Sequence, residues 1–282
     1  MTIGQRAHLQ KTLHMRFGDA ERIAEAAPQS SVAALTGLAD HRVIRRYDSR
    51  PVDLYLVRLL CAIALSAPTK SDLQQRDIVI VSEPTRRRRL VELSGGDQWM
   101  YDAPVFLVVC GNNRRQRQLH DWRGRRFAND HLDAFFNACV DAAIVLAWLV
   151  AAAEAVGLGC CPISQIRNHP FAVSELLALP DYVVPVAGLL AGWPADAGAL
   201  SPRLPLAATV HDETFDDARA RELVDAYDTR RRAIQPYLRP RLVEQFGATP
   251  DYGWSEDKAR QYSIPQRTEF GRFVREKGFK LD

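Results

Sequence analysis

The stretch HRVIRRYD, residues 41–48, places one histidine and three arginines within six positions. A planar guanidinium can bind a phosphate through two parallel hydrogen bonds, and it can also donate to the carbonyl oxygens of a ring. Arg42 and Arg45 are three residues apart, which predicts that one helical turn stacks them. The alternative is a solvated turn at the start of a domain, and these residues alone favour neither reading.

Two further stretches carry polar groups in loop-like contexts. SAPTKSDLQQRDI, residues 66–78, supplies hydroxyl, amine and amide groups, which suit a polar heterocycle with many acceptors. An ordinary connection from helix to strand is the alternative. Arg203 lies in SPRLP, where flanking prolines predict a rigid, extended backbone. Such a backbone orients an arginine for phosphate, although a plain connector would look the same.

The remaining motifs mainly exclude kinds of site, namely a phosphate-binding loop and a serine nucleophile. SGGDQWM, residues 94–100, lacks the glycine spacing and the Lys-Ser/Thr pair of a phosphate-binding loop, so it is a turn or the edge of a site. No Gly-x-Ser-x-Gly nucleophile motif occurs. The basic runs at residues 86–89 and 230–232 indicate solvated helix faces rather than anion patches.

GLGCCPISQIRNHP, residues 157–170, raises three alternatives: a thiol redox site, a metal site, or a turn that offers its backbone to a ligand. The five cysteines and the histidines show no metal-ligand spacing. A vicinal disulfide between Cys160 and Cys161 is disfavoured in a reducing compartment. The backbone turn is therefore the preferred reading, with both cysteines buried in a strand that leads into it.

The elements that must position these residues mix helices and strands without strict alternation, which predicts an α+β fold. The longest helix, over residues 130–156, is apolar almost all round, with Asp133, Asn137 and Asp141 on one face and Gly157 as a left-handed cap. Other helices are predicted at 1–40, 52–65, 84–93, 171–177, 218–233 and 258–277, and strands at 78–81, 105–110 and 183–192.

Length and composition bound the remaining possibilities. The 282 residues are 47% hydrophobic with a formal net charge of +3, which suits one large folded domain and is not the signature of a nucleic-acid binder. No apolar core of signal-peptide length opens the chain, and the uncharged apolar run 142–153 is too short to span a bilayer. We therefore expect a cytoplasmic protein without nucleic-acid or membrane partners.

Taken in order, these stretches resemble the FMN-dependent nitroreductase family, and most of all its oxygen-insensitive NADPH nitroreductases and flavin reductases. The resemblance covers about residues 38–282. It rests on His41–Arg45, the loop containing Thr69 and Gln74, Gly-Leu-Gly at 157–159 followed by Ile163–Asn168, ELLALP at 175–180, and PVAGLLAGWP together with PRLP around Arg203.

The resemblance implies an α+β nitroreductase-like fold, with a central mixed or antiparallel sheet flanked by helices, in an intertwined homodimer. It implies an FMN-binding core at 38–215 and a helical C-terminal excursion at 216–282 that covers the active site and the partner subunit, while the helical N-terminal extension at 1–37 lies outside it. The implied cofactor is non-covalent FMN. Its implied contacts are His41, Arg42, Arg45, Thr69, Lys70, Ser71, Gln74, Gln98, Pro162, Ile163, Ser164, Gln165 and Arg203.

Within that set, the resemblance assigns the FMN phosphate to His41 or Arg42 with Arg203. It assigns the flavin N1–O2 edge to Arg45, and flavin N5 to the backbone of Ser164 and Gln165. The loop residues Thr69, Lys70, Ser71 and Gln74 would line the ring or ribityl chain of the partner's FMN. Gln98 stands next to the position of a ring-contacting glutamine.

The implied activity is a ping-pong NAD(P)H oxidoreductase that passes hydride through flavin N5 to nitroaromatics, quinones or free flavin. The flavin carries the chemistry, so no catalytic side chain is expected. The chain departs from the family pattern at Val43, Asp97, Ser164, Gln165 and Ser201. Two alternatives stay open: a same-fold flavoenzyme for flavin fragmentation, dehalogenation or heterocycle oxidation, or a non-catalytic flavin-binding module.

Overall fold

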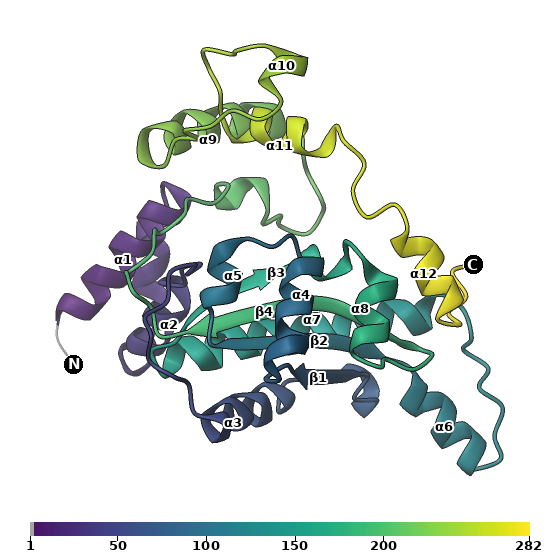
Figure 1. Ribbon diagram of the computed structural model, residues 1–282. Helices are drawn as coiled ribbons and strands as arrows, with labels where there is room; N and C mark the ends of the chain where they lie inside the picture. The colour runs from purple at the N-terminus through teal and green to yellow at the C-terminus, as the bar shows by residue number, and fades with distance from the viewer. Residues whose placement is uncertain (1–2) are drawn as a thin grey trace. The chain divides into compact units, whose positions relative to one another are not determined.

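The computed structural model describes residues 3–282 (Figure 1). Its helices are α1 Ile3–Phe17, α2 Val32–Ala39, α3 Leu54–Leu65, α4 Pro84–Leu93, α5 Gln98–Asp102, α6 Arg114–Trp122, α7 Leu132–Ala155, α8 Pro170–Leu176, α9 Ala220–Ile234, α10 Val243–Phe246, α11 Trp254–Tyr262 and α12 Phe270–Glu276. Its strands are β1 Arg76–Ile80, β2 Val105–Asn112, β3 Gly159–Ile163 and β4 Val183–Gly192. Short 3-10 turns include η1 Glu21–Ala26, η3 Lys70–Asp72 and η4 Gln165–Arg167.

Two compact units divide the chain, and each is built from separate stretches. The first comprises the described residues up to Arg42 together with Ala199–Gln266, and the second comprises Val43–Gly198 and Arg267–Asp282. The predicted segments 1–37, 38–215 and 216–282 are divisions of the sequence and stay a prediction.

The second unit is a sheet covered on both faces. All neighbouring strands are antiparallel, in the order β1-β2-β4-β3, which confirms the expected α+β architecture. Apolar residues of α3 and α7 pack on one face, and those of α4, α5 and α8 pack on the other. Figure 1 shows α7 behind the sheet and α4 in front of it. Burial on both faces explains why β2 is apolar from Val105 to Cys110.

Local signals in the sequence set several of the element boundaries. Helix α4 spans the predicted residues 84–93, with Pro84 in its first turn and Glu83 accepting hydrogen bonds from the amides of Thr85 and Arg86. Helix α7 ends before Gly157, whose φ of 85° confirms the left-handed cap. The predicted helix at 258–277 is wrong as a single element, because Pro265 follows the end of α11 and the chain resumes helix only at α12.

Helix α7 also bears on the predicted absence of a membrane segment. Among residues 3–282 it is the one helix long and apolar enough to cross a bilayer by length and composition. The core helix of a folded domain passes the same test, and α7 packs against α3 and the sheet.

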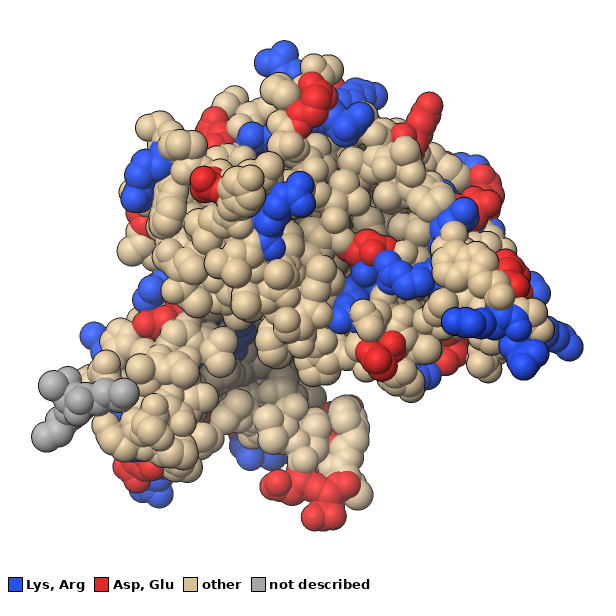
Figure 2. All heavy atoms as spheres, turned by 90° about the horizontal axis from the view of Figure 1, so that it is seen from below, with Lys and Arg blue, Asp and Glu red and all other residues tan. Residues whose placement is uncertain are grey.

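Charged side chains of both signs are interspersed over the face drawn in Figure 2, with broad uncharged areas between them.

Candidate functional site

The segment that carries Arg45 is extended, not helical. Val43 forms a parallel bridge with Cys160 of β3, and the amide of Ile44 donates to the carbonyl oxygen of Cys160 at 2.9 Å. The side chain of Ile44 fills the space beside Gly159, where an added Cβ would come within 2.6 Å of it. The predicted helical stacking of Arg42 and Arg45 is therefore wrong, and the β-branched pair Val43-Ile44 explains the preference for an extended backbone.

Arg45 lies between β3 and α5. Its guanidinium carbon is 5.5 Å from the centre of the Trp99 ring, and its side chain also contacts the Cys161 thiol. No carboxylate within residues 3–282 forms an ion pair with Arg45, which is solvent-exposed. The positive charge is thus held in place by a ring and a thiol but is not neutralised.

The two adjacent cysteines are structural residues of β3. Both are buried free thiols, which confirms their predicted place in a strand. Burial raises the pKa of the Cys160 thiol, and burial also raises that of Cys161, although the nearby Arg45 charge opposes the shift. The thiol is the dominant form of both at neutral pH, so neither is poised as a nucleophile.

The end of β3 carries exposed residues beside these buried thiols. Pro162 and Ser164 are exposed while Ile163 is buried, and half-buried Gln165 begins the turn η4. Gln98, the first residue of α5, is exposed and donates to Asp102 at 2.9 Å. The structure therefore brings together Arg45, the end of β3 and, through Trp99, the helix that carries Gln98.

A buried carboxylate, that of Asp141 on α7, holds the amides of the loop at residues 69–75, while Gln116 and Arg115 of α6 donate to carbonyl oxygens of the loop. Asp141 is fully buried and accepts hydrogen bonds from Thr69 Oγ1 at 2.5 Å, the Lys70 amide at 3.0 Å and the Gln75 amide at 2.9 Å. The Thr69 oxygen in turn accepts from the Gln74 amide at 2.9 Å. This predicted cofactor contact therefore has its hydroxyl engaged in holding the loop.

The same loop stores backbone strain. Ser71, Asp72 and Gln74 have φ values of 49°, 57° and 52°, which non-glycine residues seldom adopt. Lys70 Nζ lies 3.3 Å from Asp133 of α7, on the face where Asp133, Asn137 and Asp141 were predicted to align. Within the described part of the chain, no hydrogen bond, ion pair or ring contact joins this loop to Arg45 or to the end of β3.

Arg203 belongs to the first unit and projects from the segment between its two prolines. It is exposed, and its side chain makes only long hydrogen bonds, to the carbonyl oxygens of Ser201 at 3.4 Å and Pro202 at 3.3 Å. A cavity of about 560 Å³ opens beside it. The cavity is lined by Phe17, Ser201, Pro202, Arg203, Leu204, Thr209, Tyr227, Arg231, Tyr237 and Trp254.

His41 and Arg42 follow directly after α2 in the same unit. Arg42 Nη2 lies 3.8 Å from Asp40, which also accepts hydrogen bonds from His8 at 2.6 Å and Thr12 at 2.8 Å. Burial alone would raise the pKa of Asp40, but these hydrogen bonds and the charges of His8 and Arg42 hold it below its usual value. The carboxylate is therefore ionised at neutral pH and ties Arg42 to α1.

Two further arginines of this unit hold its segments together, and the local sequence pattern does not predict their role. Arg16 of α1 is buried and donates to the carbonyl oxygens of Ala39, His41 and Ser201. Arg230 donates to those of Met15, Arg16 and Arg203, so the solvated face predicted at 230–232 is wrong for this residue. The spacing of His8, Thr12 and Arg16, each four residues apart, was the available signal.

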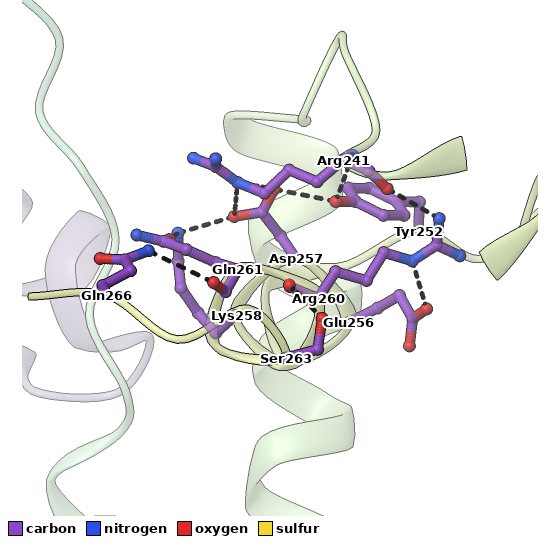
Figure 3. Close-up of polar contacts among 9 residues, drawn as sticks. All are labelled: Arg241, Tyr252, Glu256, Asp257, Lys258, Arg260, Gln261, Ser263 and Gln266. Atoms are coloured by element: carbon purple, nitrogen blue, oxygen red, sulfur yellow. Dashed lines mark hydrogen bonds and ion pairs between the residues drawn. The ribbon is translucent and has the colours of Figure 1, made fainter. Parts of the chain in front are cut away.

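The C-terminal excursion contains a compact polar network (Figure 3). Arg241, Tyr252 and Lys258 converge on Asp257, whose side chain is 2% exposed. Arg260 is also buried, and it donates to Glu256, Thr249 and the carbonyl oxygens of Arg241 and Gly247. Arg239 is exposed, and no described residue pairs with it. Of these three arginines, Arg239 is thus the one left for a ligand.

A metal centre finds no support within residues 3–282, where no group of three His, Cys, Asp or Glu side chains could hold an ion. The donors that the site does offer are guanidinium groups and hydroxyls, beside the exposed residues Pro162 and Ser164. Such donors suit a phosphorylated, acceptor-rich organic molecule.

Comparison with known proteins gives consistent matches along the chain. Residues 38–193 match the nitroreductase family, and residues 201–282 match the nitroreductase family C-terminal domain. An "FMN reductase [NAD(P)H]" of Bacillus subtilis is 33% identical over 253 residues, covering 88% of this chain and 98% of that protein. An "Oxygen-insensitive NADPH nitroreductase" of Salmonella typhimurium is 33% identical over 220 residues, covering 74% of this chain and 90% of that protein.

Solved structures agree with the sequence matches. The structure of B. megaterium NfrA2 superimposes with a TM-score of 0.80 at 32% identity, covering 88% of this chain and 98% of that one. The structure of YcnD, a hypothetical oxidoreductase of Bacillus subtilis, gives a TM-score of 0.79 at 31% identity with the same coverage.

Proposed function

Because the chain belongs to the nitroreductase family, we propose that it is an enzyme, an FMN-dependent oxidoreductase that takes electrons from NAD(P)H. The observation that carries the proposal is the uncompensated guanidinium of Arg45, held against Trp99 beside the exposed end of β3. The relatives named FMN reductase, NADPH nitroreductase and NADPH-flavin oxidoreductase support the same cofactor and electron donor.

The residues present fit FMN by the chemistry of their donors. Arg203 is exposed and makes only long bonds to backbone oxygens, so its charge is available for a phosphate. Arg45 offers a fixed positive charge for the acceptor edge of a flavin ring, where negative charge develops on reduction. When bound, FMN supplies the hydride chemistry, and the side chains only bind and orient it.

The assignment of individual contacts stays a proposal. We assign the phosphate to Arg203 with His41 or Arg42, and the ring to Arg45, Gln98 and the segment Pro162–Gln165. The loop residues Lys70, Ser71 and Gln74 would reach the cofactor of a partner subunit. Thr69 would act on it through the loop conformation that it stabilises together with Asp141.

The partner that this assignment requires is a second copy of the chain. Apolar side chains lie exposed along α7, with Leu132, Phe136 and Val140 spaced four residues apart. Helix α3, which packs on α7, exposes Leu59 and Ile63. Apolar rows on neighbouring helices suit a dimer interface. Light scattering should give a dimer mass, and Phe136→Arg should shift it toward the monomer.

The preferred donor and the order of the reaction are finer proposals. Exposed Arg239 is suited to the 2′-phosphate of NADPH, since Arg260 is buried and Arg241 pairs with Asp257. The acceptor is a small molecule, and we expect nitroaromatics, quinones or free flavin to serve in a ping-pong order. A cytoplasmic location stays a prediction.

An absorbance spectrum of the purified protein tests the proposal most directly. The expected result is a bound-flavin spectrum that bleaches on anaerobic titration with NADPH or NADH. A colourless protein that stays apo after FMN is added would overturn it. Flavin that binds but is reduced by neither nucleotide would instead support the non-catalytic alternative.

One feature favours a second candidate with the same fold and a different reaction. Ser164 and Gln165 place side chains at the turn expected to meet flavin N5, where the family pattern has two glycines. Half-buried Gln165 could select a substrate other than a nitroaromatic. Steady-state turnover of NADPH with a nitroaromatic separates the candidates, because rapid turnover argues against the second.

A further inference from the structure

Helix α1 presents one face to the stretch at residues 39–42. His8, Thr12 and Arg16 are each four residues apart and therefore lie on the same face. His8 and Thr12 hydrogen-bond the carboxylate of Asp40, and Arg16 donates to the carbonyl oxygens that flank it, those of Ala39 and His41. One helix face thus fixes both the side chain and the backbone of the segment that leads into Arg42.

Arg16 also reaches a segment far away in the sequence. Its Nη1 donates to the Ser201 carbonyl oxygen at 2.8 Å, while its own carbonyl oxygen accepts from the Arg203 amide at 2.6 Å. A single residue therefore joins the segment of His41 to that of Arg203. Because Arg16 is 5% exposed and its guanidinium is planar, the two segments are held at a spacing set by this group.

Arg230 adds a second link at the end of α1. It donates to the carbonyl oxygens of Met15 at 3.1 Å, Arg16 at 3.0 Å and Arg203 at 2.5 Å. Gly18 ends the helix with φ 96°, and an added Cβ there would lie 3.4 Å from Arg230. A cation at the last carbonyls of a helix is favourable, so α1 and the Arg203 segment hold each other in place.

Helix α1 has no counterpart in the family match, which begins at residue 38. We propose that α1 is a chain-specific addition to the phosphate site, in which Arg16 is a positioning residue that sets His41 and Arg42 against Arg203 for the phosphate of FMN. This rests on the proposed function. Arg16 itself is buried under three carbonyl oxygens and acts through the two segments, not by touching the ligand.

Comparison of FMN with riboflavin tests the proposal, because riboflavin lacks the phosphate. The measurement is the dissociation constant of each for the apoprotein, from the quenching of flavin fluorescence. Arg16→Ala should weaken FMN binding roughly tenfold or more, the range for lost hydrogen bonds to a charged group, and leave riboflavin binding within about twofold. A general loss of structure would weaken both ligands alike.

Arg6→Ala is the matched control. Arg6 lies on the same helix and donates to the backbone oxygens of Ala24, Glu25 and Ala27, all within the N-terminal segment. Its replacement should leave the preference for FMN unchanged, where the preference is the dissociation constant of riboflavin divided by that of FMN. If this preference falls equally in both variants, the assignment to Arg16 is overturned.

The outcomes separate the inference from the function. If the wild type does not prefer FMN to riboflavin, the proposed phosphate site fails and the inference fails with it. If the wild type prefers FMN and Arg16→Ala keeps that preference, only the inference fails. Should Arg16→Ala not fold, the half-exposed His8 and the buried Thr12 offer a milder test. His8→Ala with Thr12→Ser should lower the FMN preference about threefold, and an unchanged preference would contradict the proposal.

Discussion

One loop of the second unit and several segments of the first are held by side chains of opposite chemistry, although both kinds of contact occur in each unit. In the second unit, one buried carboxylate, Asp141, collects two backbone amides and a hydroxyl of the loop at 69–75. In the first unit, buried or half-buried arginines such as Arg16, Arg230 and Arg260 donate to backbone carbonyl oxygens. The carboxylate satisfies donors at one point, whereas each guanidinium fork spans several segments.

The difference has a physical origin. A carboxylate is acceptor-only and compact, so it can hold a strained turn whose amides converge, such as the one containing Ser71, Asp72 and Gln74. A guanidinium carries five donors on a long stem and can bridge segments that do not converge. Loss of the carboxylate should disturb one loop in the core of the second unit. Loss of a guanidinium should loosen the links between segments of the first unit.

The largest effect is expected from Asp141→Ala. It leaves the amides of Lys70 and Gln75 and the Thr69 hydroxyl without their acceptor, so the free energy of unfolding should fall by about 3 kcal/mol or more. Chemical denaturation measures this fall. Asp133→Asn, at a half-exposed position on the same helix, is the control and should cost less than about 0.5 kcal/mol. A loss below about 1 kcal/mol for Asp141→Ala would contradict the central role of this carboxylate.

Arg260→Ala should have a smaller and more local effect. The change removes donors to the carbonyl oxygens of Arg241 and Gly247, which are part of the excursion and not of a central core. We expect about 2 kcal/mol of local stability to be lost, seen as faster hydrogen exchange over residues 241–249 with little change in the sheet. Exchange that accelerates equally in α1 and α9, which belong to the same unit, would show that the first unit is not secured segment by segment.

Arg239→Ala tests whether an arginine of the first unit that holds no backbone oxygen serves a ligand instead. Loss of its charge should raise the KM for NADPH roughly tenfold, about 1.4 kcal/mol, and leave the KM for NADH unchanged. Steady-state kinetics with both nucleotides decide the matter. A parallel rise in both KM values would mean that Arg239 shapes the excursion and does not read the 2′-phosphate.

The smallest effect concerns acid stability through Asp257. Burial would raise its pKa, but hydrogen bonds from Lys258 and Tyr252 and the charges of Lys258 and Arg241 bring it below the usual value. A lowered folded-state pKa contributes stability that is present above about pH 4 and is lost as the pH falls through the folded-state pKa. The stability difference between wild type and Asp257→Asn should therefore shrink toward zero below pH 4. Because Arg241 and Lys258 are partly solvated, we expect the pH-dependent part of this stability difference to be less than about 1 kcal/mol.

Features set by neighbouring residues were predictable from the sequence. Helix α4 begins at Pro84 and β4 spans the predicted 183–192, because capping, proline and apolar runs act locally. The shared face of Asp133, Asn137 and Asp141 followed from helical spacing and is confirmed by the hydrogen bond from Asn137 to Asp133. The family resemblance at 38–282 is likewise confirmed.

What escaped prediction depends on residues far apart in the chain. Arg16 donates to Ser201, 185 positions away, and the four-residue spacing of His8, Thr12 and Arg16 indicates a shared helix face but not this partner. Arg230 looked solvated because its partners are backbone oxygens, which carry no sequence signal. The extended conformation at Arg45 is decided by pairing of Val43 with Cys160, a tertiary contact that overrides the spacing of the arginines.

The place of β3 at one edge of the sheet bears on how the protein avoids associating with itself through its strands. An edge strand offers unpaired amides and carbonyls to any other extended chain, which makes it a starting point for aggregation. Here Val43 already bridges Cys160 on the open side, and exposed Pro162 has no amide to donate. The strand whose end we propose to meet a small ligand is therefore a poor template for a foreign strand.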